Sequence, residues 1–280
     1  MRRRALLATV TALVVAAGLV IVWRAARPEP IVLAQATKRP FEARLSDARA
    51  DRFRPYAGGT RAGGTREEVR VDTLAQLAKR ADWRGLADAC LLDGQLDRAA
   101  AALERAGASA DVASDRAALA LLQHDPAAAL AHATRALALA PGLPQAAWNR
   151  ALALGDLELV HAATGAFAAI AARGEKGWAD EAKARAAALR GELAGERDRA
   201  RRPAPEAGAA YEQARAALQK GDAAGAEAQA RAGLAQARDA NLDPTDLPRR
   251  FYVLLADAAR AQGKTALADA YVDEARLVMP

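Results

Sequence analysis

Small and apolar residues recur along most of this chain at a spacing that is typical of paired helices. Each copy of the pattern has a small residue, a turn-forming residue seven positions later, and an alanine five positions after that. The fullest of five copies runs from Trp83 to Ala106, and the last runs from Tyr252 to Pro280. This spacing predicts two amphipathic helices joined by a tight turn, with alanines where the helix axes approach closely. Because one such pair cannot bury its apolar face alone, the pairs are expected to stack into a solenoid.

The register of the pattern sets the expected helix boundaries. Helix pairs are predicted over residues 73–106, 112–140, 145–173, 207–238 and 248–279, with an additional helix from Trp178 to Ala200. The alanines expected to open the second helices are Ala99, Ala129, Ala163, Ala226 and Ala268. Glycine occupies three of the five turn positions, as Gly94, Gly221 and Gly263. The other two turns hold His124 and Glu158, which fit a tight turn poorly.

This pattern resembles the tetratricopeptide repeat over roughly residues 72–280. A repeat of that family has a large residue, a leucine, small residues at the helix contacts, a turn glycine and a closing proline, and Pro141 and Pro280 fill the closing position here. Ala129 and Ala163 are 34 positions apart, which is the period of the family. The resemblance implies an all-α fold, a right-handed α-solenoid of about five helix pairs. Residues 71–200 would hold the first repeats and the extra helix, residues 201–206 a hinge, and residues 207–280 two further repeats.

In this family the first helices of the pairs line a concave groove that binds a peptide or protein partner. Carried over by register, the resemblance implies that the groove is lined by Arg84, Asp88, Ser114, Trp148, Asn149, Tyr211, Arg215, Asp257 and Arg260. Trp148 fits the groove and the core of its helix equally well. One variant of the family grips an extreme C-terminal carboxylate with basic residues, but Gly208 and Glu212 stand at the corresponding positions, which disfavours that variant.

The N-terminal region predicts a membrane anchor followed by a linker. An uncharged run from Ala5 to Trp23 is long enough to span a bilayer. We therefore expect a transmembrane signal anchor over residues 1–24, a single pass of the inner membrane, and a periplasmic or other extracytoplasmic location for the rest of the chain. A cleaved signal peptide is the alternative, with Ala34-Gln-Ala36 as its cleavage motif. Residues 25–70 are rich in Pro, Gly and Arg, which predicts a disordered linker.

The apolar side chains within that linker, Phe41, Leu45, Phe53 and Tyr56, give part of it the means to dock on another surface. The net charge of the chain is +6, with 40 Lys and Arg against 34 Asp and Glu. Residues 1–70 hold 14 of these basic residues and 6 of the acidic ones, so the repeat region carries 26 against 28 and is almost neutral. A nucleic-acid-binding protein would carry its basic patch on the folded domain, so no nucleic-acid partner is expected.

Candidate chemistry is sparse. The Gly263-Lys264-Thr265 sequence lacks the earlier glycine and the preceding strand of a phosphate-binding loop. Of the histidines, His124, His132 and His161, His132 has no second ligand three or four positions away, and His124 stands at an exposed turn position. The lone cysteine, Cys90, excludes an internal disulfide and is expected to be a buried, unreactive thiol. Paired acidic residues such as Asp180-Glu181 are interpreted as a solvated helix face. We expect a non-enzymatic protein without cofactor or metal.

A narrower resemblance adds an alternative. The apolar N-terminal segment, the basic stretch from Arg39 to Ser46 and the repeat motifs Asp115–Leu119, Trp148–Leu152 and Gly177–Ala182 look like the front part of large bacterial CHAT-domain proteins. Those proteins carry tetratricopeptide repeats ahead of a caspase-like peptidase domain. The leading expectation is a membrane-tethered interaction scaffold that binds a peptide or protein partner. The alternative is the sensor part of a CHAT-type protease system whose catalytic domain is absent from this chain.

Overall fold

A computed structural model describes residues 31, 33–34, 36–51, 54–56, 68–199, 205–239 and 247–278, with the side chains of 194–199, 205–206 and 239 left aside. The chain divides into two units, Met1–Val32 and Leu33–Pro280, and the second unit contains the helices.

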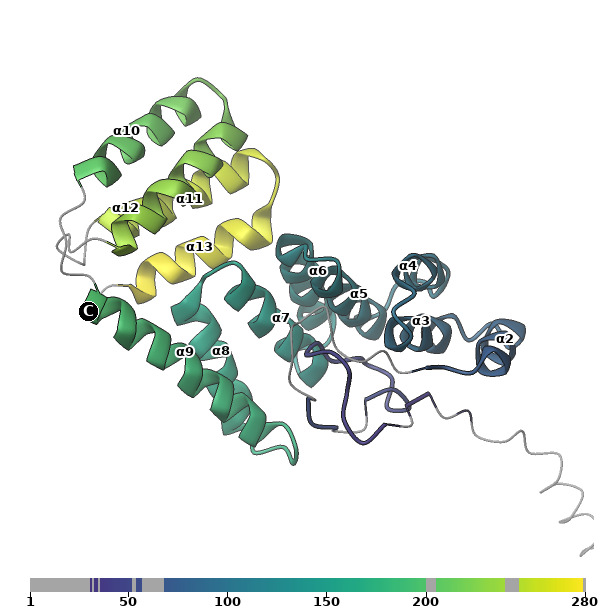
Figure 1. The fold of residues 1–280 in the computed structure, drawn as a ribbon. Helices are drawn as coiled ribbons and strands as arrows, with labels where there is room; N and C mark the ends of the chain where they lie inside the picture. The colour runs from purple at the N-terminus through teal and green to yellow at the C-terminus, as the bar shows by residue number, and fades with distance from the viewer. Residues whose placement is uncertain are drawn as a thin grey trace, which may run out of the picture. The chain divides into compact units, whose positions relative to one another are not determined.

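The described residues form twelve helices and no strand, which confirms the all-α prediction (Figure 1). The helices are α2 (Val71–Lys79), α3 (Trp83–Leu92), α4 (Leu96–Arg105), α5 (Ala110–Leu122), α6 (Pro126–Leu139), α7 (Pro144–Asp156), α8 (Val160–Ala172), α9 (Ala179–Arg199), α10 (Pro205–Gln219), α11 (Ala223–Asp239), α12 (Leu247–Ala261) and α13 (Thr265–Leu277).

The helices pack in consecutive pairs, α3 with α4, α5 with α6, α7 with α8, α10 with α11 and α12 with α13, as expected for a solenoid. The additional helix predicted from Trp178 is α9, which packs along α8. The first predicted pair, residues 73–106, contains three helices instead of two, because the chain breaks between α2 and α3. Ala81 takes a left-handed conformation there, with φ of 53°, and Asp82 caps α3 by accepting a hydrogen bond from the Gly85 N–H at 3.0 Å.

Alanine sits at the close helix approaches as predicted. The five alanines at the start of the second helices, Ala99, Ala129, Ala163, Ala226 and Ala268, are each 0% exposed. Because these methyl groups are fully buried, a longer side chain at any of the five positions would force off-rotamer packing.

The five inter-helix turns share one backbone conformation whether or not they carry glycine. Gly94, Gly221 and Gly263 have φ of 75°, 85° and 73°. His124 and Glu158 have φ of 59° and 60° at the equivalent positions, so the repeat imposes a left-handed turn on residues that disfavour it.

We expect His124→Gly to raise the free energy of unfolding by about 1 kcal/mol, because a non-glycine residue in this conformation stores roughly that strain. Thermal unfolding followed by circular dichroism would measure it as a rise of roughly 2–4 °C. The matched control is the preceding residue, Gln123→Gly, where φ is −85° and glycine should destabilise the helix end. Destabilisation by both changes would contradict the shared turn geometry.

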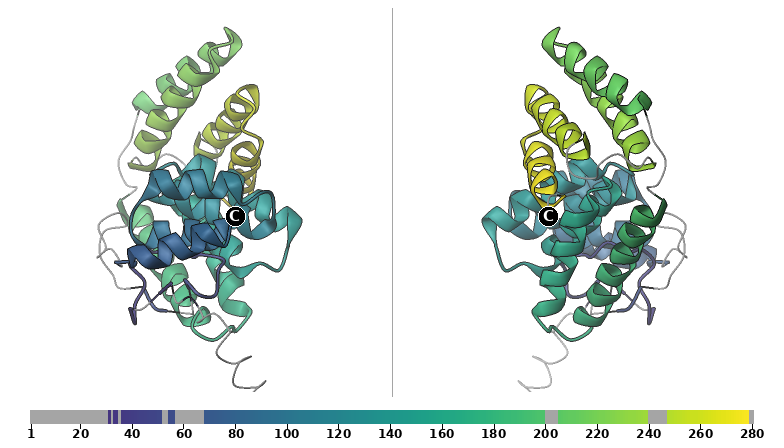
Figure 2. Two further views of the ribbon diagram at one scale, coloured as in Figure 1. Left: turned by 90° about the vertical axis from the view of Figure 1, so that its right-hand side faces the viewer. Right: turned by 90° about the vertical axis from the view of Figure 1, so that its left-hand side faces the viewer.

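The last helix returns to the middle of the chain instead of extending the stack from α9. Helix α13 packs on α6 and α8, and Figures 1 and 2 show it beside them from different sides. Glu274 of α13 is fully buried, and its carboxylate accepts hydrogen bonds from the N–H groups of His161 and Ala162 at 3.0 and 2.8 Å. These N–H groups belong to the first turn of α8, where backbone donors lack helical partners. A carboxylate from a distant helix therefore caps α8.

Two expectations for the N-terminal region need correction. No helix in the part of the chain that the structure describes is long and apolar enough to cross a membrane, which contradicts the predicted single-pass inner-membrane location. The predicted anchor itself, residues 1–24, lies outside the described residues. The structure also differs from the predicted disordered linker, since Arg44, Leu45 and Ala50 are at most 1% exposed. The reason is that this part of residues 25–70 packs on the repeats.

Candidate peptide-binding groove

Residues 39–51, here called the docked segment, lie along the first helices of the helix pairs (purple in Figure 1). The segment has no regular secondary structure. Within it the N–H groups of Ala50 and Asp51 donate to the Asp47 carbonyl at 2.9 and 3.1 Å, and other backbone groups bond to the helices. Its contacts come from α3, α5, α7 and α9, and we call the surface that these helices offer the groove.

The centre of the groove holds the backbone of the docked segment through one asparagine. Asn149 of α7 is fully buried; its Oδ1 accepts a hydrogen bond from the Arg44 N–H at 2.9 Å, and its Nδ2 donates to the Arg44 carbonyl at 2.9 Å. The neighbouring Trp148 donates from Nε1 to the Glu42 carbonyl at 3.0 Å. All three bonds involve main-chain atoms of the docked segment, so none of them depends on which side chains the segment carries.

Two buried carboxylates lie on one side of this centre. Asp115 of α5 accepts hydrogen bonds from the N–H and the hydroxyl of Ser46, at 2.7 and 2.6 Å. Burial raises the pKa of Asp115 to about 7, although the bonds from Ser46 and the charge of Arg84 lower it in part. Asp88 of α3 is also fully buried, and it lies beside Asp115, Asp47 and Arg84. Burial and the neighbouring Asp115 raise the pKa of Asp88 well above its usual range.

The other side of the centre receives the side chain of Arg44. Its guanidinium carbon lies 3.9 Å from the ring centroid of Trp178 and 4.7 Å from that of Trp148. Its Nη2 lies 2.7 Å from Glu181 of α9, and its Nη1 lies 3.5 Å from Asp51. Burial and the charge of Arg39 lower the pKa of Arg44 to about 10, so the guanidinium stays charged at neutral pH.

Ion pairs fix the flanks of the docked segment. Arg39 pairs with Glu181, Glu42 pairs with Arg185 of α9, and Arg49 reaches Asp82 at 2.7 Å. Asp47 pairs with Arg49 at 2.5 Å and lies 4.0 Å from Arg84. Burial would raise the pKa of Asp47, but the hydrogen bonds from Arg49 lower it overall.

The structure divides the predicted groove residues into two groups. Asp88, Ser114, Trp148 and Asn149 are 0% exposed and meet at or beneath the docked segment. Arg84 is half-buried beside them and also pairs with Asp111 at 2.5 Å. Trp148 serves both interpretations offered by the sequence, since it bonds Glu42 and also packs edge-on against Phe167 at 5.3 Å.

The remaining four predicted residues lie on α10 and α12, away from the docked segment. Tyr211 packs edge-on against Phe251 at 5.5 Å and lies beneath the guanidinium of Arg250. Arg215 and Arg260 are exposed and pair one turn away on their own helices, with Glu212 at 3.6 Å and with Asp257 at 3.1 Å. These four do not join Asn149 in one site.

Sequence reasoning missed Asp115, Trp178, Glu181 and Arg185 as groove residues. Glu181 belongs to an acidic pair that was interpreted as a solvated helix face, yet it pairs with Arg39 and Arg44. The available signal was Trp178, a large aromatic immediately before an otherwise alanine-rich helix. Asp115 adjoins Ser114, which the register already placed in the groove.

The residues of candidate chemistry have structural roles where the structure describes them. Cys90 is a buried free thiol whose pKa is raised by burial. His161 Nδ1 lies 2.9 Å from the Glu274 carboxylate at the cap of α8, and Gly263 forms a turn. Across the described ranges, no cluster of three or more His, Cys, Asp or Glu side chains is placed to hold a metal ion.

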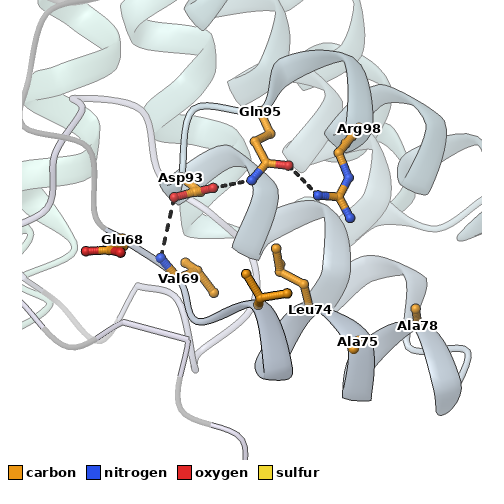
Figure 3. Close-up of a pocket in the computed structure, with 9 residues that line it drawn as sticks. Glu68, Val69, Leu74, Ala75, Ala78, Asp93, Gln95 and Arg98 are labelled. Carbon is orange, nitrogen blue, oxygen red and sulfur yellow. Dashed lines mark hydrogen bonds between the residues drawn. The ribbon is translucent and has the colours of Figure 1, made fainter.

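A second hollow lies beside α2, with a volume of about 350 Å³ (Figure 3). Its polar side chains bond to one another: Gln95 donates to Asp93, and Arg98 donates to Gln95 at 2.5 Å. Asp93 also lies 3.5 Å from the Val69 N–H. Because these polar groups already form hydrogen bonds with one another, fewer of them are available to bind a ligand than in the groove.

Comparison with known proteins adds little to this geometry. No protein-family model matches the chain, and no curated protein matches it. The crystal structure of BtubC (BKLC) from P. vanneervenii is 20% identical over 74% of this chain and 81% of that chain, with a TM-score of 0.26. A TM-score this low carries no argument about fold or function.

Proposed function

We propose that this chain is a non-enzymatic interaction module of the tetratricopeptide-repeat type, which binds an extended peptide of a partner protein in the groove. The observation that carries the proposal is the pair of hydrogen bonds between Asn149 and the backbone of Arg44. A side-chain amide that accepts from the N–H and donates to the carbonyl of one residue can hold any peptide backbone in the same way. The docked segment then occupies the site that a partner's peptide would take.

The composition of the contact also favours an exchangeable ligand. Ser46, Arg39 and Glu42 hold the docked segment through side-chain hydrogen bonds and ion pairs, beside the buried apolar side chains of Phe41, Ala43 and Leu45. Interfaces between separate chains are richer in such pairs than hydrophobic cores are. A segment in the same chain competes at an effective concentration on the order of millimolar, so a partner must bind tightly or the segment must be weakened first.

The test uses the full-length chain and a fluorescein-labelled peptide with the sequence of residues 39–51. Arg44→Glu places a carboxylate against Glu181, and Ser46→Glu places one against Asp115, so each change should free the groove. We expect fluorescence anisotropy to show peptide binding to both variants and little to the wild type. Adding Asn149→Ala should weaken binding by about 10-fold or more, since two backbone bonds are lost.

The matched control is Lys38→Glu, the same charge reversal at an exposed residue just outside the docked segment, which should behave like the wild type. Circular dichroism and melting temperature would establish that each variant is folded. Folded variants that fail to bind the peptide, or binding that survives Asn149→Ala, would contradict the proposed function.

A further inference from the structure

The most selective feature of the groove is the pocket around the Arg44 side chain, which we call the arginine box and define as Trp148, Trp178 and Glu181. Both tryptophans are 0% exposed, and their rings meet edge to face, with centroids 6.0 Å apart and an interplanar angle of 80°. Two rings in this arrangement offer their π systems to one cation at the same time. Glu181 supplies the opposite charge.

The geometry suits a guanidinium better than an ammonium group. Two different nitrogens of Arg44 reach two different carboxylates, Nη2 to Glu181 of the box at 2.7 Å and Nη1 to Asp51 of the docked segment itself at 3.5 Å. The planar group lies at the same time within 5 Å of both indole rings, with its carbon 3.9 Å from Trp178 and 4.7 Å from Trp148. A lysine carries its charge on one strongly hydrated nitrogen and cannot stack.

The arginine box and the two hydrogen bonds from Asn149 act on the same residue of the docked segment. Asn149 holds the main chain of Arg44, so the residue that is bracketed is also the residue whose side chain enters the box. Two positions further on, Ser46 reaches Asp115 with its N–H and its hydroxyl. The groove therefore reads an arginine and a hydroxyl residue separated by one position, at a fixed register.

Displacing the docked segment would leave Glu181 without either of its two arginine partners, Arg39 and Arg44. Removing the cation from a partly buried carboxylate is costly, so a ligand that restores a cation there is favoured over one that does not. This complementarity of charge selects a partner with a basic side chain at the bracketed position.

We infer that the partner's peptide places an arginine in the arginine box and a serine or threonine two residues later on Asp115, replacing the Arg44-Leu45-Ser46 stretch of the docked segment. The inference rests on the proposed function and adds to it the chemistry of the ligand. It predicts an Arg-x-Ser or Arg-x-Thr sequence in an extended part of the partner.

The test compares labelled peptides of residues 39–51 on the opened full-length variant, Arg44→Glu. Changing Arg44→Lys in the peptide should weaken binding about 10-fold or more, because the stacking and one of the two ion pairs are lost. Changing Ser46→Ala in the peptide should weaken it several-fold. The matched control is Lys38→Arg in a peptide of residues 38–51, the reverse exchange at an exposed position just outside the docked segment, and it should change affinity by less than about 3-fold.

A substitution in the protein, combined with the Arg44→Lys change in the peptide, gives a double-mutant cycle. Trp178→Leu in the opened variant should weaken the parent peptide and reduce the penalty of Arg44→Lys, since part of the selectivity is then gone. If the peptides with arginine and with lysine at position 44 bind within 2-fold of each other, the arginine box is overturned while the proposed function stands. If no peptide binds the folded, opened variants, the proposed function itself fails.

Discussion

Replacing Glu274 by alanine is expected to lower the free energy of unfolding by about 3–5 kcal/mol, which is typical when one partner of a buried charged network is removed. The carboxylate accepts hydrogen bonds from the N–H groups of His161 and Ala162, and it is 0% exposed. Leu159, the residue before α8, has an apolar side chain that offers these donors nothing. Urea unfolding would measure the loss, and the melting temperature should fall by roughly 10 °C.

The matched control is Asp273→Ala, the adjacent carboxylate on α13, whose side chain is 50% exposed and pairs with Arg276. That change should cost less than about 1 kcal/mol. Hydrogen exchange supplies a second measurement, because the amides of His161 and Ala162 should lose protection only in the Glu274 variant. A loss below 1 kcal/mol with unchanged protection would show that Glu274 does not secure α13 to α8.

The sequence predicts the helices well because their signal is local. Alanines at close approaches and glycines at turns report the register of each pair, and the helix boundaries differ from expectation mainly at Ala81. There the break between α2 and α3 depends on a left-handed residue, with φ of 53°, that is not a turn former. The return of α13 to α6 and α8 has no local signal, since its contact joins Glu274 to His161, 113 positions away.

Only part of the groove could be predicted from the sequence. The register of the first helices brings Asp88, Trp148 and Asn149 to one surface, but it says nothing about what covers them. The docked segment has the composition of a linker, with no apolar period, and arginines are ordinarily exposed. Its burial depends on partners far along the chain, such as the 105 positions between Arg44 and Asn149. Composition alone therefore assigns it to disorder, and the signal for docking is limited to apolar side chains such as Phe41 and Leu45, which are buried as that signal predicts.

The buried pair Asp88 and Asp115 makes stability depend on pH in an unusual direction. Around Asp88 the charged groups are Asp115, Asp47 and Arg84; Asp115 also meets Ser46, Arg84 and Asp111. Burial is the main cause that raises the pKa of both carboxyls. In the unfolded chain an aspartate has a pKa of about 3.9, so between roughly pH 4 and pH 7 the folded state holds protons that the unfolded state releases.

The stability that these two carboxyls contribute is therefore fully present below the pKa of an unfolded aspartate. It is lost as pH rises through the pKa values that the two carboxyls have in the folded chain. The pKa of Asp115 rises from 3.8 to about 7 and that of Asp88 rises in the same direction, so both carboxyls lower the free energy of unfolding as pH increases across that range. The pKa of His132 is lowered by burial and by Arg116 and Arg135, which removes some stability below about pH 6.5 and opposes this trend. The pKa values of Asp47 and Glu227 are lowered in the folded chain, so these two carboxyls change stability only at pH values below about 4.5.

Asp88→Asn is expected to raise the free energy of unfolding by about 2 kcal/mol or more at pH 8 and to change it little at pH 5. The substitution removes one of two buried charges and keeps the shape of the side chain. Urea unfolding at pH 5, 6, 7 and 8 would show a flatter profile for the variant than for the wild type. Asp97→Asn, at an exposed position on α4, should instead give a curve parallel to the wild type. A wild type that is more stable at pH 8 than at pH 5, or an Asp88→Asn curve that runs parallel to it, would mean that this carboxyl pair does not hold its protons in the folded state.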